Sequence, residues 1–137
     1  MVKGAYQEPV TLAYPKKADV DANYDTLTSI MMDASLKQQT KLSKDGRHPA
    51  IPGLATHDVK RIAFANAYAE KIGLGRDGYE FQMLYGIGRD LQEKLSADGF
   101  SVRVYVAFGT HWYPYFMRRL AERPANIWFF VSSFFKK

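Results

Sequence analysis

Hydrophobic residues along the chain follow two alternating patterns. Short segments rich in β-branched and aromatic residues, typical of strands, alternate with longer segments whose apolar residues recur every three or four positions, as on one face of a helix. The strand-like segments are 2–6, 51–56, 79–85 and 101–108. The helix-like segments that follow them are 21–36, the stretch between Asp58 and Gly73, the stretch from Ile87 to near Gly99, and the stretch from Gly109 to about Glu122.

Capping residues set the expected limits of the first two helices. The second helix begins behind Thr56 or Asp58 and stops at Gly73, since glycine readily ends a helix in the left-handed conformation. For the helix 21–36, Asp19 or Asp21 is available as the N-cap. The residues expected on its buried face are Tyr24, Leu27, Met31 and Ala34.

Four strand–helix units in series predict an α/β fold with a parallel sheet and right-handed crossovers. The chain has 137 residues, whereas a complete (β/α)8 barrel needs about 250. We therefore expect four strand–helix units that form half of a TIM-like barrel. The polar, lysine-rich segment 37–50 is expected to be a surface loop, and the segment 127–137, which is aromatic almost throughout, is expected to need a partner surface.

Charge and composition narrow the functional classes. Lysine and arginine number 19 and aspartate and glutamate 14, for a formal charge of +5. The basic residues are scattered in ones and twos, whereas those of a nucleic-acid-binding surface cluster. The chain has no cysteine, hence no disulfide framework and no thiolate metal site. It shows neither a signal-peptide pattern nor a run of about 18 apolar residues, so a cytoplasmic location is expected.

In β/α barrels the active groups follow the carboxyl ends of the strands. Here those positions are 3–6, 56–58, 82–85 and 105–111, where polar and aromatic side chains collect. His57 falls at a predicted helix start, where free backbone N–H groups favour an anion. It is either a ligand contact or simply a helix-start residue. The three histidines lack metal-ligand spacing, so no metal is assigned.

Arg118 and Arg119 fall on the fourth predicted helix. A guanidinium holds a carboxylate or phosphate through two parallel hydrogen bonds, so this pair is either an anion clamp or part of a solvated helix face. A dinucleotide fingerprint is absent, because Leu91 stands where Gly or Ala is required after Gly86-Ile87-Gly88. The residues alone therefore indicate a half-barrel with an anion-binding, aromatic pocket edge.

Several segments also carry a family resemblance. They are 2–6 (Val-Lys-Gly-Ala-Tyr), 14–24, 55–57 (Ala-Thr-His), 80–86 (Glu-Phe-Gln-Met-Leu-Tyr-Gly) and 115–126, which contains Arg118 and Arg119. Together they resemble the C-terminal half of proline dehydrogenase, in its monofunctional bacterial type. The resemblance covers nearly the whole chain, 1–137, apart from 37–50, which looks like an insertion.

The resemblance implies the C-terminal half of a distorted (β/α)8 barrel that holds FAD at its mouth. It implies a flavoprotein oxidoreductase of proline catabolism, in which a hydride passes from C5 of L-proline to N5 of the flavin and 1-pyrroline-5-carboxylate is formed. Electrons then pass to a membrane quinone. The implied location is cytoplasmic, with peripheral contact at the inner face of the membrane, and no nucleic acid is an expected partner.

The resemblance also implies roles for individual residues. Arg118 and Arg119 match the pair that grips the proline carboxylate, and Tyr105 matches the tyrosine that packs over the substrate ring. The further positions that match the substrate pocket are Ala5, Tyr6 and Leu84. The positions that match contacts to the flavin or to its ribityl and phosphate groups are Lys3, Gly4, Lys17, Thr56, His57, Gln82 and Glu122.

The first four strand–helix units of the family have no counterpart before Met1. The expectation is a split, truncated or mis-started gene whose isolated product is inactive and associates with an N-terminal half or with itself. The alternative is a catalytically silent half-barrel, which also needs a second half or self-association. A third possible class is a basic nucleic-acid-binding protein, which only the +5 charge suggests. DNA binding that does not change with salt concentration would exclude this class.

Overall fold

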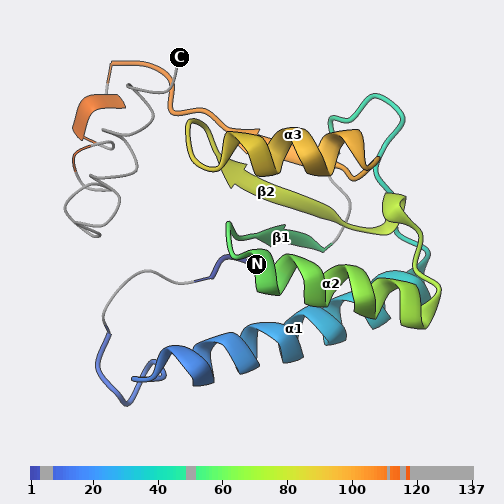
Figure 1. Ribbon diagram of the computed structural model, residues 1–137, viewed down its shortest axis with the longest axis horizontal. Coiled ribbons are helices and arrows are strands. Elements are labelled where there is room, and N and C mark those ends of the chain that lie inside the picture. Colours follow the sequence, from blue (N-terminus) through green and yellow to red (C-terminus); the bar gives the residue numbers. More distant parts are fainter. Residues whose placement is uncertain (4–7, 49–51, 111, 115–116, 118–137) are drawn as a thin grey trace.

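The computed structural model describes residues 1–3, 8–48, 52–110, 112–114 and 117 (Figure 1). The elements in chain order are α1 (Lys17–Gln38), β1 (Gly53–Ala55), α2 (Val59–Ile72), the short 3-10 helix η1 (Arg76–Gly78), β2 (Glu80–Leu84), α3 (Arg89–Ala97) and β3 (Val102–Tyr105). Residues 112–114 and 117 are helical, as the fourth predicted helix requires, and the rest of that helix and the segment 127–137 lie outside the described residues.

The three strands form one parallel sheet in the order β1-β2-β3. Phe81 at the middle of the register pairs with Leu54 on one side and Val102 on the other. An isolated parallel bridge joins Val2 to Ala55, which extends the sheet beyond β1 where the first strand was predicted. The prediction of parallel strands alternating with helices is thus confirmed for β1, β2 and β3 and their helices.

One face of this sheet is covered by helices. Successive residues of a strand point to opposite faces, and Phe81 and Met83 of β2 belong to the apolar core. The other buried members of this core are Met32, Leu54, Ile62, Ala65, Ala69, Tyr79 and Leu95. Since they come from α1, α2 and α3 as well as from the strands, these helices all cover the same face. The opposite face of β2 carries Glu80, Gln82 and Leu84.

Helix α1 differs from its prediction in its start and in its buried face. It begins at Lys17, so Asp19 and Asp21 lie inside the helix and neither caps it. Its buried residues are Tyr24, Thr28, Met32 and Ser35, whereas Leu27 is 41% exposed. Tyr24 is buried as predicted, whereas each of the other three buried residues follows its predicted position by one residue. The hydroxyls permit this, because Ser35 Oγ donates to the carbonyl of Gly78 at 2.7 Å and is thereby satisfied.

Helix α2 begins and ends where the sequence predicts. The Asp58 side chain accepts a hydrogen bond from the backbone N–H of Lys60 at 3.0 Å, and Gly73 ends the helix with φ of 72°. Helices α1 and α2 lie side by side (Figure 1). This contact brings the N-terminal ends of both helices to the carboxyl edge of β1, where the loop 56–58 leaves the sheet.

The predicted loop 37–50 begins two residues late, since α1 continues to Gln38. The described residues 39–48 form no helix or strand. Their backbone is nevertheless tied to the protein: the Leu42 N–H donates to the carbonyl of Asp77 at 2.9 Å, and Arg103 donates to the carbonyl of Gly46 at 3.0 Å. These two hydrogen bonds tie the described part of the loop to η1 and to β3.

Candidate functional site

Five of the predicted site residues that the structure describes lie at the carboxyl edge of the sheet: Lys3, Thr56, His57, Leu84 and Tyr105. Leu84 and Tyr105 are paired in register at the ends of β2 and β3. Thr56 and His57 follow the end of β1, and Lys3 follows Val2, which pairs with Ala55. Parallel strands end at one edge, so four separate stretches of sequence meet there.

His57 holds two of these stretches together. Its Nε2 accepts a hydrogen bond from the backbone N–H of Leu84 at 3.1 Å. An accepting ring nitrogen carries no proton, so in the neutral imidazole the hydrogen is on Nδ1. Nδ1 is buried and has no hydrogen-bond partner within the described parts of the chain. The site therefore contains a buried donor whose hydrogen bond is not made within the described residues.

Burial lowers the pKa of His57 below its ordinary value of 6.5. Below pH 6.5 the unfolded chain then binds a proton that the folded chain takes up only at lower pH, so the free energy of unfolding falls as the solution is acidified through this window. We expect urea denaturation at pH 7 and pH 5 to show a smaller difference for His57→Gln than for the wild type. His48→Gln, at an exposed histidine, is the matched control, and an unchanged pH dependence in both variants would contradict the assignment.

Gln82 lies on the face of the sheet opposite α1, α2 and α3, two residues before the end of β2 at Leu84. Its Nε2 donates to Glu80 Oε1 at 2.8 Å, and a Cβ on Gly53 would lie 2.5 Å from the same nitrogen. Glycine at this position of β1 therefore leaves room for the amide. Because Gly53 is paired with Glu80 in register, the amide leans toward the amino end of the sheet.

Glu80 itself is buried and paired with Arg103 of β3. The two atoms Glu80 Oε1 and Arg103 Nε are 2.9 Å apart, and Arg103 donates to Glu80 Oε2 at 3.1 Å as well. This bidentate contact satisfies both oxygens of a carboxylate that has 2% of its side chain exposed. Gln82, Glu80 and Arg103 thus form a connected polar layer beneath the carboxyl edge.

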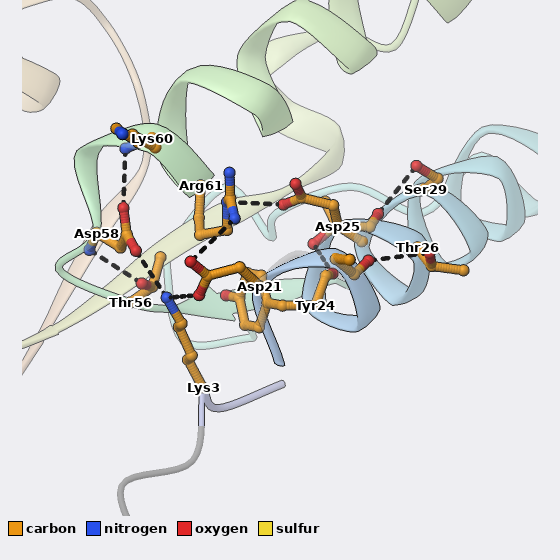
Figure 2. A network of polar contacts seen from close by, with 12 residues as sticks. Lys3, Asp21, Tyr24, Asp25, Thr26, Ser29, Thr56, Asp58, Lys60 and Arg61 are labelled. Carbon is orange, nitrogen blue, oxygen red and sulfur yellow. Dashed lines mark hydrogen bonds and ion pairs between the residues drawn. The ribbon is translucent and has the colours of Figure 1, made fainter. Parts of the chain in front are cut away.

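Lys3 belongs to an ion-pair network that joins the segment 1–3 to α1 and α2 (Figure 2), and Lys17 of α1 is part of the same network. The Lys3 ammonium contacts Asp21 of α1 and lies 2.6 Å from Asp58 Oδ2 at the start of α2. Lys17 Nζ lies 2.5 Å from Asp21 Oδ2. Hydrogen bonds from Lys17 and Lys3 lower the pKa of Asp21 to about 2. Lys3 and Lys17, both predicted to contact the flavin, are therefore held in place by ion pairs with aspartates.

Arg61 of α2 completes the network on the side of α1. Its Nη1 lies 3.4 Å from Asp21 Oδ2, and its Nε lies 3.0 Å from Asp25 Oδ1. Burial raises the pKa of the Asp25 carboxyl, which the Arg61 charge opposes. Tyr24 packs beneath these charges with a buried hydroxyl that has no partner among the described residues.

Five residues of this site are not among those predicted from the sequence: Asp21, Asp58, Arg61, Glu80 and Arg103. Asp21 and Asp58 were considered only as helix caps, a role that Asp58 does fill. A signal was available for Asp58, since it directly follows Thr56-His57 at a strand end. Glu80 and Arg103 are 23 positions apart, and only the strand register brings them together.

The remaining predicted residues are Gly4, Ala5, Tyr6, Arg118, Arg119 and Glu122, and they lie outside the described residues. Among the positions that the structure does describe, no group of three or more His, Asp or Glu side chains is arranged to hold a metal ion. Over the same positions, every helix is too short or too polar to cross a bilayer.

Comparisons with known proteins point to one family. The profile of the family described as proline dehydrogenase matches residues 1–131. The chain is similar to proline dehydrogenase of Deinococcus radiodurans, with 46% identity over 136 residues that make up 99% of this chain and 39% of the relative. It is 43% identical over 137 residues to proline dehydrogenase 2 of Bacillus subtilis, covering 100% of this chain and 41% of that protein.

A solved structure is similar as well. It is the crystal structure of proline utilization A from Bdellovibrio bacteriovorus inactivated by N-propargylglycine, with a TM-score of 0.65 and 28% sequence identity over 79% of this chain and 10% of that one. The chain thus spans about two-fifths of the length of the curated relatives it matches, and its α/β arrangement is that of a much larger protein.

Proposed function

Because the chain belongs to the proline dehydrogenase family, we propose that it supplies the C-terminal part of an enzyme that oxidises L-proline to 1-pyrroline-5-carboxylate with FAD. The observation that carries the proposal is the match over residues 1–131, together with the meeting of Lys3, His57 and Leu84 at one edge of the sheet. The chain covers 39% of the Deinococcus relative, so the proposal concerns an enzyme assembled with the rest of that length.

The proposed architecture is four strand–helix units that form the C-terminal half of a (β/α)8 barrel. The parallel order β1-β2-β3 and the bridge from Val2 to Ala55 support it. The position of α1, α2 and α3 on the same face of the sheet also fits a barrel, since the other face of a barrel sheet is turned inward. The polar layer of Glu80, Gln82 and Arg103 would then lie inside the barrel, below the site.

The described residues fit a flavin at the carboxyl edge. The buried Nδ1 of His57 has no protein partner in the described chain, and flavin ring and ribityl oxygens are acceptors of the kind such a donor requires. The residues proposed to hold FAD are Lys3, Gly4, Lys17, Thr56, His57, Gln82 and Glu122. The chemistry that the flavin supplies when bound is electron acceptance, with N5 as the acceptor of the hydride from C5 of proline.

The chain's own contribution to the reaction is the position of the substrate. Arg118 and Arg119 are proposed to hold the proline carboxylate, and Tyr105 to pack over the ring, with Ala5, Tyr6 and Leu84 as further walls of the pocket. Proline loses a hydride from C5 and a proton from its amine nitrogen, so a C=N bond replaces the C–N bond. When the carboxylate of proline is fixed, its C5 is held at the distance and orientation that hydride transfer requires. We also propose that the reduced flavin passes its electrons to a membrane quinone and that the enzyme contacts the inner face of the membrane peripherally.

Arg118→Lys and Arg119→Lys test the substrate assignment. Lysine keeps the charge and loses the planar fork, so we expect each variant to raise the KM for proline about tenfold, the equivalent of one lost charged hydrogen bond. The measurement is steady-state oxidation of proline by this chain assembled with the N-terminal part of the Deinococcus relative. Flavin absorbance should be retained.

Arg89→Lys, at an exposed residue that pairs with Glu93 on α3, is the matched control and should leave KM unchanged. An unchanged KM in Arg118→Lys and Arg119→Lys would show that these guanidiniums form a solvated helix face. Absence of both flavin and turnover from the assembled wild type would contradict the proposed function as a whole.

A catalytically silent half-barrel is the second candidate. The exposed aromatic and apolar residues that follow β3 favour an association, because Val106 and Phe108 are largely open to solvent and β3 is the last strand of the sheet within the described residues. Gel filtration of the chain, alone and mixed with the N-terminal part of a relative, separates the two. A monomer that never associates would count against both, whereas an assembly without flavin would favour the silent form.

A further inference from the structure

The ion-pair network around Lys3 has a consequence for flavin binding that rests on the proposed function. Lys3, Lys17 and Arg61 supply three cations, and Asp21, Asp25 and Asp58 supply three carboxylates. The charges balance within the network. Lys3 therefore offers little net positive charge to a distant phosphate. The network instead fixes the position of the Lys3 ammonium.

The contacts of Lys3 show how that position is fixed. Its side chain is 14% exposed, and its ammonium has one carboxylate from α1 and one from the start of α2 within contact distance (Figure 2). Each of these carboxylates is held in turn. Asp58 Oδ1 accepts from the N–H of Lys60, and Asp21 contacts both Lys17 and Arg61.

The backbone of Lys3 is fixed as well. Its N–H donates to the carbonyl of Ala55 at 3.2 Å, which places the residue beside the loop that carries Thr56 and His57. An ammonium has three donors, and Asp21 and Asp58 take two of them. A donor thus remains, on a group anchored at both its backbone and its side chain.

We propose that Asp21 and Asp58 are positioning residues, which orient the Lys3 ammonium for a hydrogen bond to FAD without touching the cofactor themselves. The competing view is that Lys3 serves as a cation for the flavin phosphates. The two views predict opposite signs. If charge attraction dominated, removal of a neighbouring carboxylate would strengthen FAD binding, because the ammonium would lose its counterion. If position dominates, the same removal weakens FAD binding.

The test is FAD affinity, measured by quenching of flavin fluorescence, in the assembled protein carrying Asp21→Asn or Asp58→Asn. Asparagine is nearly isosteric with aspartate and is as good an N-cap, so α2 keeps its cap while the charge is removed. We expect each variant to weaken FAD binding about tenfold, the equivalent of one charged hydrogen bond. Asp98→Asn, which breaks the exposed pair between Asp98 and Lys94, is the matched control and should leave the affinity unchanged.

A double-mutant cycle links the effect to Lys3. Lys3→Met is combined with Asp58→Asn, and the losses of affinity should be non-additive, since a residue that acts through Lys3 has nothing to orient once Lys3 is gone. Thermal unfolding of each variant is recorded alongside. A simple loss of stability would lower the melting temperature and leave the affinity of the remaining folded protein, and its dependence on Lys3, unchanged.

The outcomes separate this inference from the proposed function. Equal or tighter FAD binding by Asp21→Asn and Asp58→Asn, or additive losses in the cycle, would overturn the positioning role while leaving proline dehydrogenase activity intact. A wild-type assembly that binds no FAD would overturn the proposed function, and the positioning role would fall with it.

Discussion

Phe81→Ala is expected to lower the free energy of unfolding by about 3–5 kcal/mol, the range for a large aromatic side chain removed from a packed core. Phe81 is fully buried at 0% exposure. Its ring meets Tyr79 edge-on at 5.7 Å and Phe100 at 5.8 Å, in the geometry that aromatic pairs favour. The cavity would open between β2 and the helices that pack on it. Urea denaturation followed by circular dichroism measures the change.

Phe108→Ala is the matched control for this substitution. The same side chain is lost, but Phe108 is 99% exposed, so the free energy of unfolding should change by less than about 0.5 kcal/mol. Equal losses in the two variants would mean that Phe81 does not occupy the packed position described above.

Arg103→Met is expected to cost about 3 kcal/mol, at the lower end of the range for breaking a buried ion pair by removing one partner. Glu80 would keep its hydrogen bond from Gln82, but it would lose both contacts to the guanidinium and remain buried as a charge. The lower end applies because 40% of the Arg103 side chain is exposed. The loss of the bond to the Gly46 carbonyl adds to the effect and loosens the loop 39–48.

The double variant Glu80→Gln/Arg103→Met separates the stranded charge from the lost packing. It should be more stable than Arg103→Met alone, because no buried carboxylate is left without a counterion. Arg89→Met, at an exposed pair with Glu93, is the control and should cost about 0.3–0.5 kcal/mol, as exposed helix pairs do. A double variant less stable than Arg103→Met would argue against the buried pair.

The sequence predicted the units of this fold well and the buried face of α1 poorly. Asp58 and Gly73 limit α2 through local geometry, which a sequence reveals directly. Thr28 and Ser35 are buried because their hydroxyls bond to the carbonyls of Tyr24 and Gly78. Hydrophobic periodicity does not register a polar residue satisfied in this way. It therefore favoured Leu27, which the structure leaves partly exposed.

Strand limits show the same dependence on partners. The predicted strand 101–108 ends at Tyr105, because β3 pairs with β2 only as far as Leu84. The β-branched and aromatic character of Val106 and Phe108 was real, but within the described chain those residues have no neighbouring strand. The β-propensity of a segment indicates that it can form a strand, but pairing with a neighbouring strand determines where that strand ends.

The position of the candidate site could be predicted from the sequence, but the contacts that hold its residues in place could not. Strand ends placed Thr56, His57 and Leu84 at one edge from topology alone, and the hydrogen bond between the last two confirms that they meet. The tie between Asp58 and Lys3 spans 55 positions and depends on how α2 packs beside the segment 1–3. Such contacts follow from tertiary packing, which no local pattern in the sequence encodes.

The order β1-β2-β3, in which neighbours in the sheet are neighbours in the chain, also bears on how the protein is made. A strand leaving the ribosome finds its partner among strands already synthesised, so pairing need not wait for distant sequence. Each new strand closes a loop of modest length and becomes the open edge for the next one. This strand order lets the sheet assemble from β1 toward β3 as the chain is synthesised, with the most recently added strand as the edge open to chaperones and to other nascent chains.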